Sequence, residues 1–359
     1  MSTWPDDAAA SRTGPGRAAV VRTARPTLAD VAVAAGVSAK TVSNVLLGRA
    51  GVSDETRSRV LAVVEQVGYR VNRAGRGLSS GRTGRVAIVV PMLYQPYFSE
   101  LAERLILALA EHGLSTTLRL APGRDDERDA VVGATTPDVD GVIICPHSFI
   151  DSMLDGVELT RPVVQLGGSQ ATRVDCVVMG EHEGMYAATA HLLRSGRRRI
   201  ALVWNAVGGG RLEGDRYDGY VEALQERGLD VDEALVTMGS DWDRRMSGYE
   251  AMVSLLRSGV RFDAAVCVND AIAVGVLRAL RSHGRRVPED IALVGFDDTA
   301  EGRFTVPPLT SVNPRKEQMV GHAVRMLVDR LNGYDGAPRL VRTGADLMVR
   351  ASSGPARDE

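Results

Sequence analysis

The stretch TLADVAVAAGVSAKTVSN, from Thr27 to Asn44, decides the fold of the N-terminal part of the chain. It holds two short amphipathic helix patterns joined by a glycine, which is the layout of a helix-turn-helix. Thr27 with Asp30 three residues later predicts a capping box. Gly36 predicts the turn, and Ser38 predicts the cap of the second helix. A helix-turn-helix inserts its second helix into the major groove of DNA, so the stretch indicates a DNA-binding head.

The two faces of the second helix differ in chemistry. Val42 and Val45 fall on the inner face, whereas the outer face is left with small polar side chains and one lysine. Such a face fits base edges and phosphates and would make a poor protein core. A third helix is expected to start at Ser53, with two acidic residues in its first turn, and to end at Gly68.

Further motifs follow in a fixed order along the chain. DVA, AGVS, TVS and VL lie in the head, VS, TR and GY follow up to Tyr69, and the leucine of GRGLSSGR is Leu78. On these residues the chain resembles the LacI/GalR (lactose repressor) family of bacterial transcription regulators, from about Pro26 to Ser353. The resemblance implies an N-terminal all-α helix-turn-helix head. It also implies an α/β core like that of periplasmic binding proteins, with two parallel-sheet subdomains and a ligand cleft between them.

Charge is distributed unevenly along the chain. Between Arg22 and Arg85 there are eleven basic and four acidic residues, a net charge of +7. Because the whole chain carries −2, the remainder carries −9. A basic head on an acidic body is what a DNA-binding domain fused to a sensor shows. An ordinary solvated surface explains the body but not the positive charge gathered around the helix-turn-helix.

From Arg85 onward, apolar strand patterns such as VAIVVP and IALVGF alternate with helix patterns. This alternation predicts parallel sheets covered on both faces, with too many strands for one compact sheet. Residues 1–24, rich in Ala, Arg, Gly and Pro, predict a disordered tail or a misassigned start. The expected domains are this tail (1–24), a helix-turn-helix domain (25–70), a hinge (71–84) and an effector-binding and dimerisation domain (85–353). The resemblance divides the last into subdomain N (about 85–196 and 311–340) and subdomain C (about 197–310 and 341–353), with crossings near Arg197, Thr310 and Leu340.

The resemblance assigns base reading to three residues of the second helix: Ala39, Lys40 and Asn44. Lysine can donate to guanine O6 and N7, asparagine can pair with adenine, and alanine can touch a thymine methyl group. A solvated surface lysine is the alternative for Lys40. Four hydroxyl side chains are expected to contact phosphates, with helix capping as the alternative or additional role. They are Thr27, Ser38, Thr41 and Ser43.

The hinge from Asn72 to Leu78 contains Gly75 and Gly77. Each glycine costs a helix roughly 1 kcal/mol relative to alanine, so the hinge alone is expected to be unfolded. The resemblance implies that two hinges fold when they pair over the minor groove. Leu78 would then wedge between central base pairs, while Asn72 and Arg73 contact DNA. An ordinary linker leucine is the alternative for Leu78.

Polar and aromatic residues at the carboxyl ends of predicted strands indicate a small-molecule site. The resemblance matches Arg216, in RYDGY, to a pocket arginine and Trp242 to a tryptophan that stacks on sugar in some relatives. Arginine and carboxylates in one cleft provide the donors and acceptors that vicinal sugar hydroxyls need. The alternatives are a core position for the two aromatics after the first strand, packing for the tryptophan and a helix cap for the asparagine. The expected effector-binding residues are Tyr97, Phe98, Arg216, Trp242, Asn269 and Asp297.

The sequence departs from the family pattern at MGEHE, residues 179–183, where the family commonly has Asp-Asn before a helix. The usual pocket aspartate is therefore absent. Glu181 or Glu183 can take its place, and this difference leaves the identity of the ligand open.

The sequence contains no recognisable catalytic pattern. The glycines at 208–210 lack the spacing of a phosphate-binding loop, and His182-Glu183 is not part of an HExxH motif. No G-x-S-x-G elbow occurs, and the adjacent acids Asp297 and Asp298 would point apart on an extended segment. We therefore expect no enzymatic activity, no cofactor and no metal ion.

The cysteines and the distribution of apolar residues indicate where the protein is located in the cell. Cys145, Cys176 and Cys267 lie in apolar strand-like contexts, which predicts buried free thiols in a reducing compartment. The sequence has neither an apolar run of membrane-spanning length nor a secretory signal. A cytoplasmic, nucleoid-associated protein is expected, without a membrane partner.

These observations favour a homodimeric transcription regulator, a repressor that binds a pseudo-palindromic operator in double-stranded DNA. A small-molecule effector, expected to be a sugar, would control it. A dimer is expected because the chain ends at GPARDE without a leucine-heptad tail. Two alternatives remain open. The Arg216 and Asp297 cleft argues against a ligand-independent architectural DNA-binding protein, and the head argues against a sugar-binding protein without regulation.

Overall fold

The structure of the protein is a computed structural model that describes residues 26–46, 51–69, 82–133, 138–146, 151–205, 214–240 and 244–354. The described residues form two compact units. The first is a helical head that ends at Tyr69, and the second is an α/β core that begins at Arg82.

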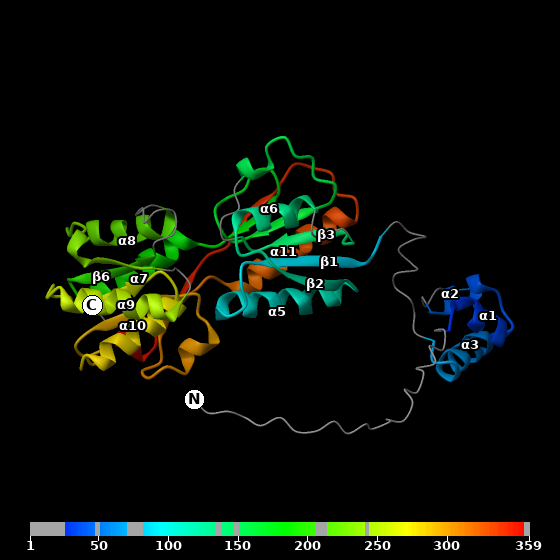
Figure 1. Ribbon diagram of the computed structural model, residues 1–359, viewed down its shortest axis with the longest axis horizontal. Coiled ribbons are helices and arrows are strands. Elements are labelled where there is room, and N and C mark those ends of the chain that lie inside the picture. The colour runs from blue at the N-terminus through cyan, green and yellow to red at the C-terminus, as the bar shows by residue number, and fades with distance from the viewer. Residues whose placement is uncertain are drawn as a thin grey trace, which may run out of the picture. The chain divides into compact units, whose positions relative to one another are not determined.

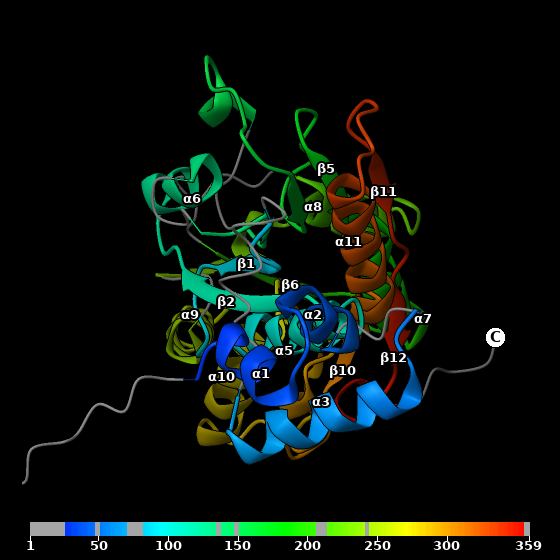
Figure 2. The same ribbon diagram turned by 90° about the vertical axis from the view of Figure 1, so that its right-hand side faces the viewer.

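Three helices form the head, and Figure 2 shows α3 running along α1 and α2. Helix α1 spans Leu28–Ala35, α2 spans Ala39–Leu46, and α3 spans Asp54–Gln66. Their shared core consists of valine, alanine and one tyrosine side chain, namely Val31, Ala32, Ala35, Val42, Val45, Val60 and Tyr69. The helix-turn-helix and the third helix predicted from the sequence are therefore confirmed.

Local hydrogen bonds fix the ends of the head helices. The Oγ1 atom of Thr27 accepts the Asp30 N–H at 3.3 Å, and Asp30 Oδ2 accepts the Thr27 N–H at 2.7 Å. This reciprocal pair is the expected capping box. Gly36 ends α1 with φ +64°, a left-handed conformation that glycine adopts without strain. Ser38 Oγ accepts the Thr41 N–H at 3.1 Å and so caps α2, as predicted.

The core contains two sheets that lie side by side, each with helices on its faces (Figure 1). The first sheet has the strand order β11-β5-β4-β3-β1-β2, and all of its strand pairs are parallel. Its strands are β1 (Arg85–Val90), β2 (Ser115–Leu120), β3 (Gly141–Ile144), β4 (Val163–Leu166), β5 (Asp175–Val178) and β11 (Leu340–Arg342). We call this sheet with its helices subdomain N.

Alternating side chains of β1 build the two faces of subdomain N. Val86, Ile88 and Val90 pack with helices α5 (Pro96–Glu111) and α11 (Lys316–Leu331). Ala87 and Val89 point to the opposite face, where α6 (Arg124–Val132) packs. Strands β3, β4 and β5 are buried along their whole length, as continuous apolar strands in a doubly covered parallel sheet predict.

The second sheet has the order β12-β10-β9-β8-β6-β7, and its edge strand β12 is antiparallel to β10. Its strands are β6 (Ile200–Asn205), β7 (Val236–Gly239), β8 (Ala264–Cys267), β9 (Ala292–Phe296), β10 (Thr310–Asn313) and β12 (Asp346–Met348). Its helices are α7 (Glu181–Arg194), α8 (Asp215–Gln225), α9 (Arg245–Arg257) and α10 (Asp270–Ser282). Its short 3-10 turns are η3 (Glu233–Leu235), η4 (Ala300–Arg303) and η5 (Ala351–Ser353), whereas η1 (Asp151–Leu154) lies between β3 and β4 of the first sheet. We call the second sheet with its helices subdomain C.

The chain passes between the subdomains three times: from β5 to α7, from β10 to α11, and from β11 to β12. The first pass lies at residues 179–180, whereas the sequence led us to expect it near Arg197. Helix α7 packs on the second sheet, where a Cβ at Gly184 would lie 2.7 Å from Val312 and 2.9 Å from Phe296. The later passes lie at 314–315 and 343–345, because β10 completes the second sheet and β11 completes the first.

Within the described part of the chain, no helix has both the length and the apolar character needed to cross a membrane. The three cysteines, Cys145, Cys176 and Cys267, are buried free thiols. Burial raises the pKa of Cys145 to about 12.

Candidate functional site

The second helix of the head presents one polar face. Ser38, Ala39 and Lys40 are exposed, and the next polar side chains on the helix, those of Thr41, Ser43 and Asn44, are half-buried. The Ser38 and Thr41 hydroxyl oxygens lie 2.9 Å apart, so these two groups hydrogen-bond each other. Thr27 and Ser38 therefore serve as helix caps, the alternative role considered for them, and both remain exposed. The hinge residues Asn72, Arg73 and Leu78, and Trp242 of the core, lie outside the described residues.

The candidate effector site is built by segments from both subdomains. Subdomain N contributes the first turn of α5, where Tyr97 and Phe98 are buried with ring centroids 5.1 Å apart in an edge-to-face arrangement. Both side chains belong to the hydrophobic core. Yet the Tyr97 hydroxyl is a buried polar atom without a hydrogen-bond partner in the described residues, and so is Oε1 of Gln95, just before the helix. Buried polar atoms of this kind call for a partner, and a bound ligand can supply one.

Subdomain C contributes Arg216 from the first turn of α8. Its side chain is 15% exposed, and its guanidinium lies over the Phe296 ring, 4.1 Å from the centroid. Nε and Nη2 lie 3.0 and 2.9 Å from Oε1 of Glu181, and Nη1 donates to the Val268 carbonyl oxygen. Glu181 belongs to the segment 179–183, where the sequence departs from the family pattern. Its carboxylate thus pairs with Arg216. Sequence reasoning named Glu181 as a substitute but did not foresee this pairing.

Asp297 follows β9 and is buried beside this arginine. Burial raises the pKa of its carboxyl to about 8, although the positive charge of Arg216 opposes the shift. The pKa of Tyr97 lies well above its ordinary value because of burial, and the nearby Asp297 carboxyl adds to the shift. The expected residues Tyr97, Arg216 and Asp297 therefore lie close enough to influence one another electrostatically.

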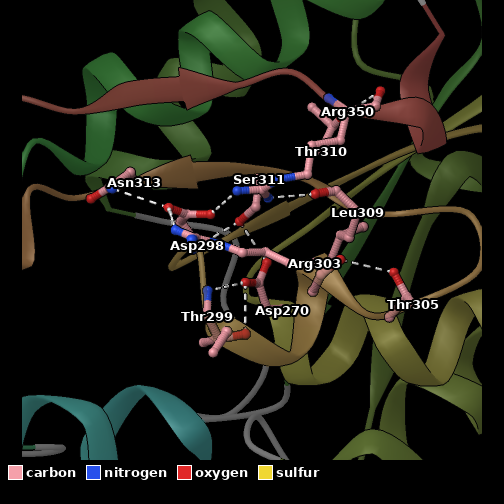
Figure 3. Close-up of polar contacts among 12 residues, drawn as sticks. Asp270, Asp298, Thr299, Arg303, Thr305, Leu309, Thr310, Ser311, Asn313 and Arg350 are labelled. Carbon is pink, nitrogen blue, oxygen red and sulfur yellow. Dashed lines mark hydrogen bonds and ion pairs between the residues drawn. The ribbon is translucent and has the colours of Figure 1, made fainter.

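Asp298, the neighbour of Asp297, has a structural role (Figure 3). Its carboxylate pairs with Arg350, accepts a hydrogen bond from Asn313 at 3.1 Å and lies 3.5 Å from Arg303. Its backbone N–H donates to Ser311 Oγ at 2.9 Å. These partners all belong to subdomain C, and their contacts secure the loop that carries Asp298.

Asn269 and Asp270 also support the loops around the site. Asn269 Oδ1 accepts the Ile272 N–H at 2.8 Å and caps α10, the alternative role considered for it. Asp270 accepts hydrogen bonds from Ser311 Oγ at 2.6 Å and from the N–H and hydroxyl of Thr299 at 2.7 and 3.0 Å, as Figure 3 shows. Burial raises the Asp270 pKa to about 6, although these hydrogen bonds oppose the shift. Asp270 thus links the segment after β8 to the loop after β9.

The charges of the site nearly cancel. Arg216 is balanced by Glu181, and a carboxyl with a pKa of about 8 is mostly protonated at neutral pH. Hydroxyl, carboxyl and guanidinium groups in one buried place can exchange hydrogen bonds with an uncharged polar ligand. No group of three His, Cys, Asp or Glu side chains that could hold a metal ion occurs among the described residues.

Comparisons with known proteins agree with this architecture. Residues 27–72 match the family described as bacterial regulatory proteins, lacI family, and residues 189–353 match the periplasmic binding protein-like domain. The HTH-type transcriptional regulator CelR of Thermobifida fusca is 36% identical over 348 residues, covering 92% of this chain and 99% of the relative. The chain belongs to the LacI family of bacterial regulatory proteins.

Other LacI-family proteins extend the likeness to solved structures. AscG of Escherichia coli K12, an HTH-type transcriptional regulator, is 33% identical over 91% of this chain and 98% of its own length. A lac repressor dimer bound to operator and the anti-inducer ONPF superimposes with a TM-score of 0.79 at 25% identity, covering 92% and 99% of the two chains. A CelR–cellobiose complex superimposes with a TM-score of 0.65 at 35% identity, covering 91% and 100%. This LacI-family member is a transcription regulator with a helix-turn-helix head.

Proposed function

We propose that this regulator is a homodimeric repressor whose affinity for a pseudo-palindromic operator changes when a sugar binds between its two subdomains. The proposal rests on one observation: three polar side chains from the two subdomains lie close enough to interact electrostatically. Tyr97 comes from subdomain N, and Arg216 and Asp297 come from subdomain C. A ligand that bonds to all three must tie the subdomains together, so its binding free energy can shift their relative position.

The chemistry of the site favours an uncharged, hydroxyl-rich effector. The site offers donors and acceptors without a net charge, because Glu181 balances the Arg216 guanidinium and the Asp297 carboxyl is mostly protonated. The Tyr97 hydroxyl, which has no partner among the residues that the structure describes, adds a further group of this kind. A sugar presents adjacent hydroxyls that use both. Phe98, Asn269 and Trp242 are the further effector-binding residues that we propose, and Trp242 would stack on the apolar face of the ring.

The head would read DNA with the polar face of its second helix. Lys40 would donate to guanine, Asn44 would pair with adenine, and Ala39 would contact a thymine methyl group. Hydroxyl groups and the hinge would fix the register by contacts to the backbone and the minor groove. We propose these roles for Thr27, Ser38, Thr41, Ser43, Asn72, Arg73 and Leu78. The functional modules would be the head (25–70), the hinge (71–84) and the core (85–353), acting in the cytoplasm on nucleoid DNA.

An apolar surface on subdomain C fits a second copy of the chain. Phe304 is 85% exposed and Val306 is 69% exposed. Val306 also lines a surface pocket with Val274 and Leu277 of α10. The relative with the highest TM-score quoted above, the lac repressor, is a dimer in its complex with operator, which supports a dimer here.

The test of the proposal is a map of the sites that the purified protein binds on fragmented DNA of its own genome, at stated salt concentrations. Sharp palindromic peaks are the expected result. The same peaks are then titrated with cellobiose and a panel of neutral sugars, one of which should change the affinity for DNA. Binding without sequence preference under all conditions would overturn the proposal of a specific repressor.

The titration also has a thermodynamic check. By linkage, the factor by which a sugar changes operator affinity must equal the factor by which operator changes sugar affinity. Calorimetry with and without operator DNA measures the second factor. Because this equality holds wherever the sugar binds, two unequal factors would show that the two titrations do not measure the same equilibrium.

A further inference from the structure

Two charged residues of subdomain N contact the loop of subdomain C that follows β9. Glu100, in the second turn of α5, accepts the Ala300 N–H with Oε1 at 2.7 Å. Its other oxygen accepts a hydrogen bond from Lys316 Nζ at 2.6 Å. Lys316 is the first residue of α11, and its ammonium also donates to the Asp298 carbonyl oxygen at 3.1 Å. One carboxylate and one ammonium thus bridge the two subdomains.

The loop that these residues contact has an unusual backbone. Asp297 has φ +109° and Asp298 has φ +46°, both in the region that side chains other than glycine rarely adopt. Such conformations cost free energy and persist only where surrounding contacts impose them. Subdomain C supplies part of this support, because the Asp297 N–H donates to the Val312 carbonyl oxygen at 2.8 Å. Glu100 and Lys316 supply the contacts that come from the other subdomain.

The surroundings of position 316 favour lysine over arginine. The chain contains only two lysines, Lys40 and Lys316, whereas arginine supplies its other side-chain cations. The Lys316 side chain is 5% exposed and that of Glu100 is 17% exposed. A compact ammonium can bond both to a carboxylate and to a backbone carbonyl in this space, whereas a planar guanidinium needs a wider fork of acceptors. A buried ammonium is also costly without its partner, so the contact depends on Glu100 being in place.

We propose that Glu100 and Lys316 form a clamp that positions Asp297 for the effector only while the two subdomains are closed upon each other. Neither side chain has to touch the ligand. Separation of the subdomains removes both contacts from the 298–300 backbone at once, and the loop that presents Asp297 then keeps only its contacts within subdomain C. The clamp therefore couples subdomain closure to the shape of the site. This inference rests on the proposed function for its effector, but the contacts themselves do not.

The first test is amide hydrogen exchange on the full-length protein without any ligand. Lys316→Met leaves both partners of the hydrogen bond between Ala300 and Glu100 intact. If the clamp acts as a unit, the Ala300 amide should exchange at least about tenfold faster in this variant than in the wild type. Glu317→Gln, an exposed acid on the next residue of α11, is the matched control and should leave exchange unchanged. Equal exchange in Lys316→Met and wild type would overturn the clamp.

The second test measures closure directly. Spin labels on Asp125→Cys in α6 and Glu250→Cys in α9, both exposed positions, report one distance between the subdomains. Dilution with unlabelled protein restricts the measurement to one protomer. Glu100→Gln and Lys316→Met should each shift the distribution towards open distances, whereas the exposed Glu103→Gln should not. The double variant should add little to either single change, because the residues act through one contact. Distributions that match the wild type would overturn the proposal.

A third measurement links the clamp to the effector, with cellobiose or the responding sugar of the panel as the probe. The affinity should fall about tenfold or more in both Glu100→Gln and Lys316→Met. Equal losses in the Glu103→Gln control would contradict a specific role. If the wild type responds to no sugar, the proposed function fails. Amide hydrogen exchange and the spin-label distances still test the clamp, because both are measured without ligand.

Discussion

The guanidinium of Arg216 and the carboxylate of Glu181 form a forked ion pair in which Nε and Nη2 approach the same oxygen, at 3.0 and 2.9 Å. The pair brings the start of α8 against the start of α7. It occupies one edge of the arginine and removes its net charge from the site. The arginine can then act as a hydrogen-bond donor to an uncharged ligand without attracting anions strongly.

Removal of this partner should change the charge preference of the site. Glu181→Gln leaves the Arg216 charge uncompensated, so affinity for inorganic phosphate or a sugar phosphate should rise by roughly tenfold, about 1.4 kcal/mol. Direct calorimetric titration with inorganic phosphate or a sugar phosphate measures the change. Glu183→Gln, an exposed acid on the same helical turn, is the control and should behave as the wild type. Equal anion affinity in both variants would show that Glu181 does not set the preference.

Arg216→Ala should abolish the response to effector while operator binding persists. The substitution removes a mostly buried guanidinium and its charge-assisted hydrogen-bond donors. We therefore expect the affinity for effector to fall about a hundredfold. Operator binding with and without sugar, followed by fluorescence anisotropy, checks both halves of the statement. Arg286→Ala, which removes an exposed arginine paired with Asp290, is the control. Loss of operator binding in Arg216→Ala would instead assign this residue to the fold.

Lys40→Ala should weaken binding to the operator by roughly 10- to 100-fold and relax specificity at one base pair. The side chain is exposed on the second helix of the head, so the fold of the head should not change. Binding is measured against operator variants at several salt concentrations. Arg59→Ala, an exposed arginine on α3, is the charge-matched control and should retain the base preference. A uniform loss across all sequences would assign Lys40 to phosphate contact.

The buried Asp297 should make stability depend on pH. Its pKa of about 8 in the folded protein exceeds the ordinary value of 3.8. The folded protein therefore keeps a proton that the unfolded chain releases between pH 4 and 8, so the free energy of unfolding falls as pH rises through this window. Asp297→Asn cannot ionise and should lose this part of the decline.

Melting temperatures of the wild type and Asp297→Asn at pH 5 and pH 9 check this prediction. The difference should move in favour of the variant by several degrees at the higher pH. Asp290→Asn is the control, because hydrogen bonds from Arg286 already hold the Asp290 pKa at about 2. Its difference from the wild type should stay constant over the same range. Parallel curves for Asp297→Asn and wild type would contradict the raised pKa.

Close helix packing in subdomain C should make one glycine irreplaceable. A Cβ at Gly275 of α10 would lie 1.8 Å from the Arg245 carbonyl oxygen and 2.8 Å from the Tyr249 nitrogen. Gly275→Ala should therefore destabilise the core by roughly 3 kcal/mol as α9 and α10 move apart. Gly321→Ala, on α11 with nothing within 4 Å, is the matched control and should stabilise by about 1 kcal/mol. Thermal unfolding of the two variants should thus shift in opposite directions.

The sequence was most informative where the interactions are local. The capping box of Thr27 and Asp30, the turn at Gly36 and the cap at Ser38 all join residues five positions apart or fewer. A short stretch therefore contains the groups that begin and end the two helices of the helix-turn-helix. The apolar strands of the core were equally readable, because burial on both faces leaves a continuous hydrophobic run.

Contacts between distant segments could not be read from the chain. Adjacent acids at 297 and 298 look alike in sequence, yet Asp297 faces Arg216 and Asp298 faces Arg350. The first crossing between the subdomains also depended on which sheet α7 covers, and helix periodicity carries no such information.

The sequence by itself thus determined the class of head, the two-sheet core and the residue types of the candidate site, because these follow from short-range periodicity, capping and motif order. Only the tertiary structure decided which acid pairs with Arg216, that the Tyr97 hydroxyl has no partner among the described residues, and that Glu100 contacts Lys316, which lies 216 positions away in the chain. Such pairs form because packing of the two sheets brings distant side chains together, and their free energy depends on burial and distance rather than on separation along the chain.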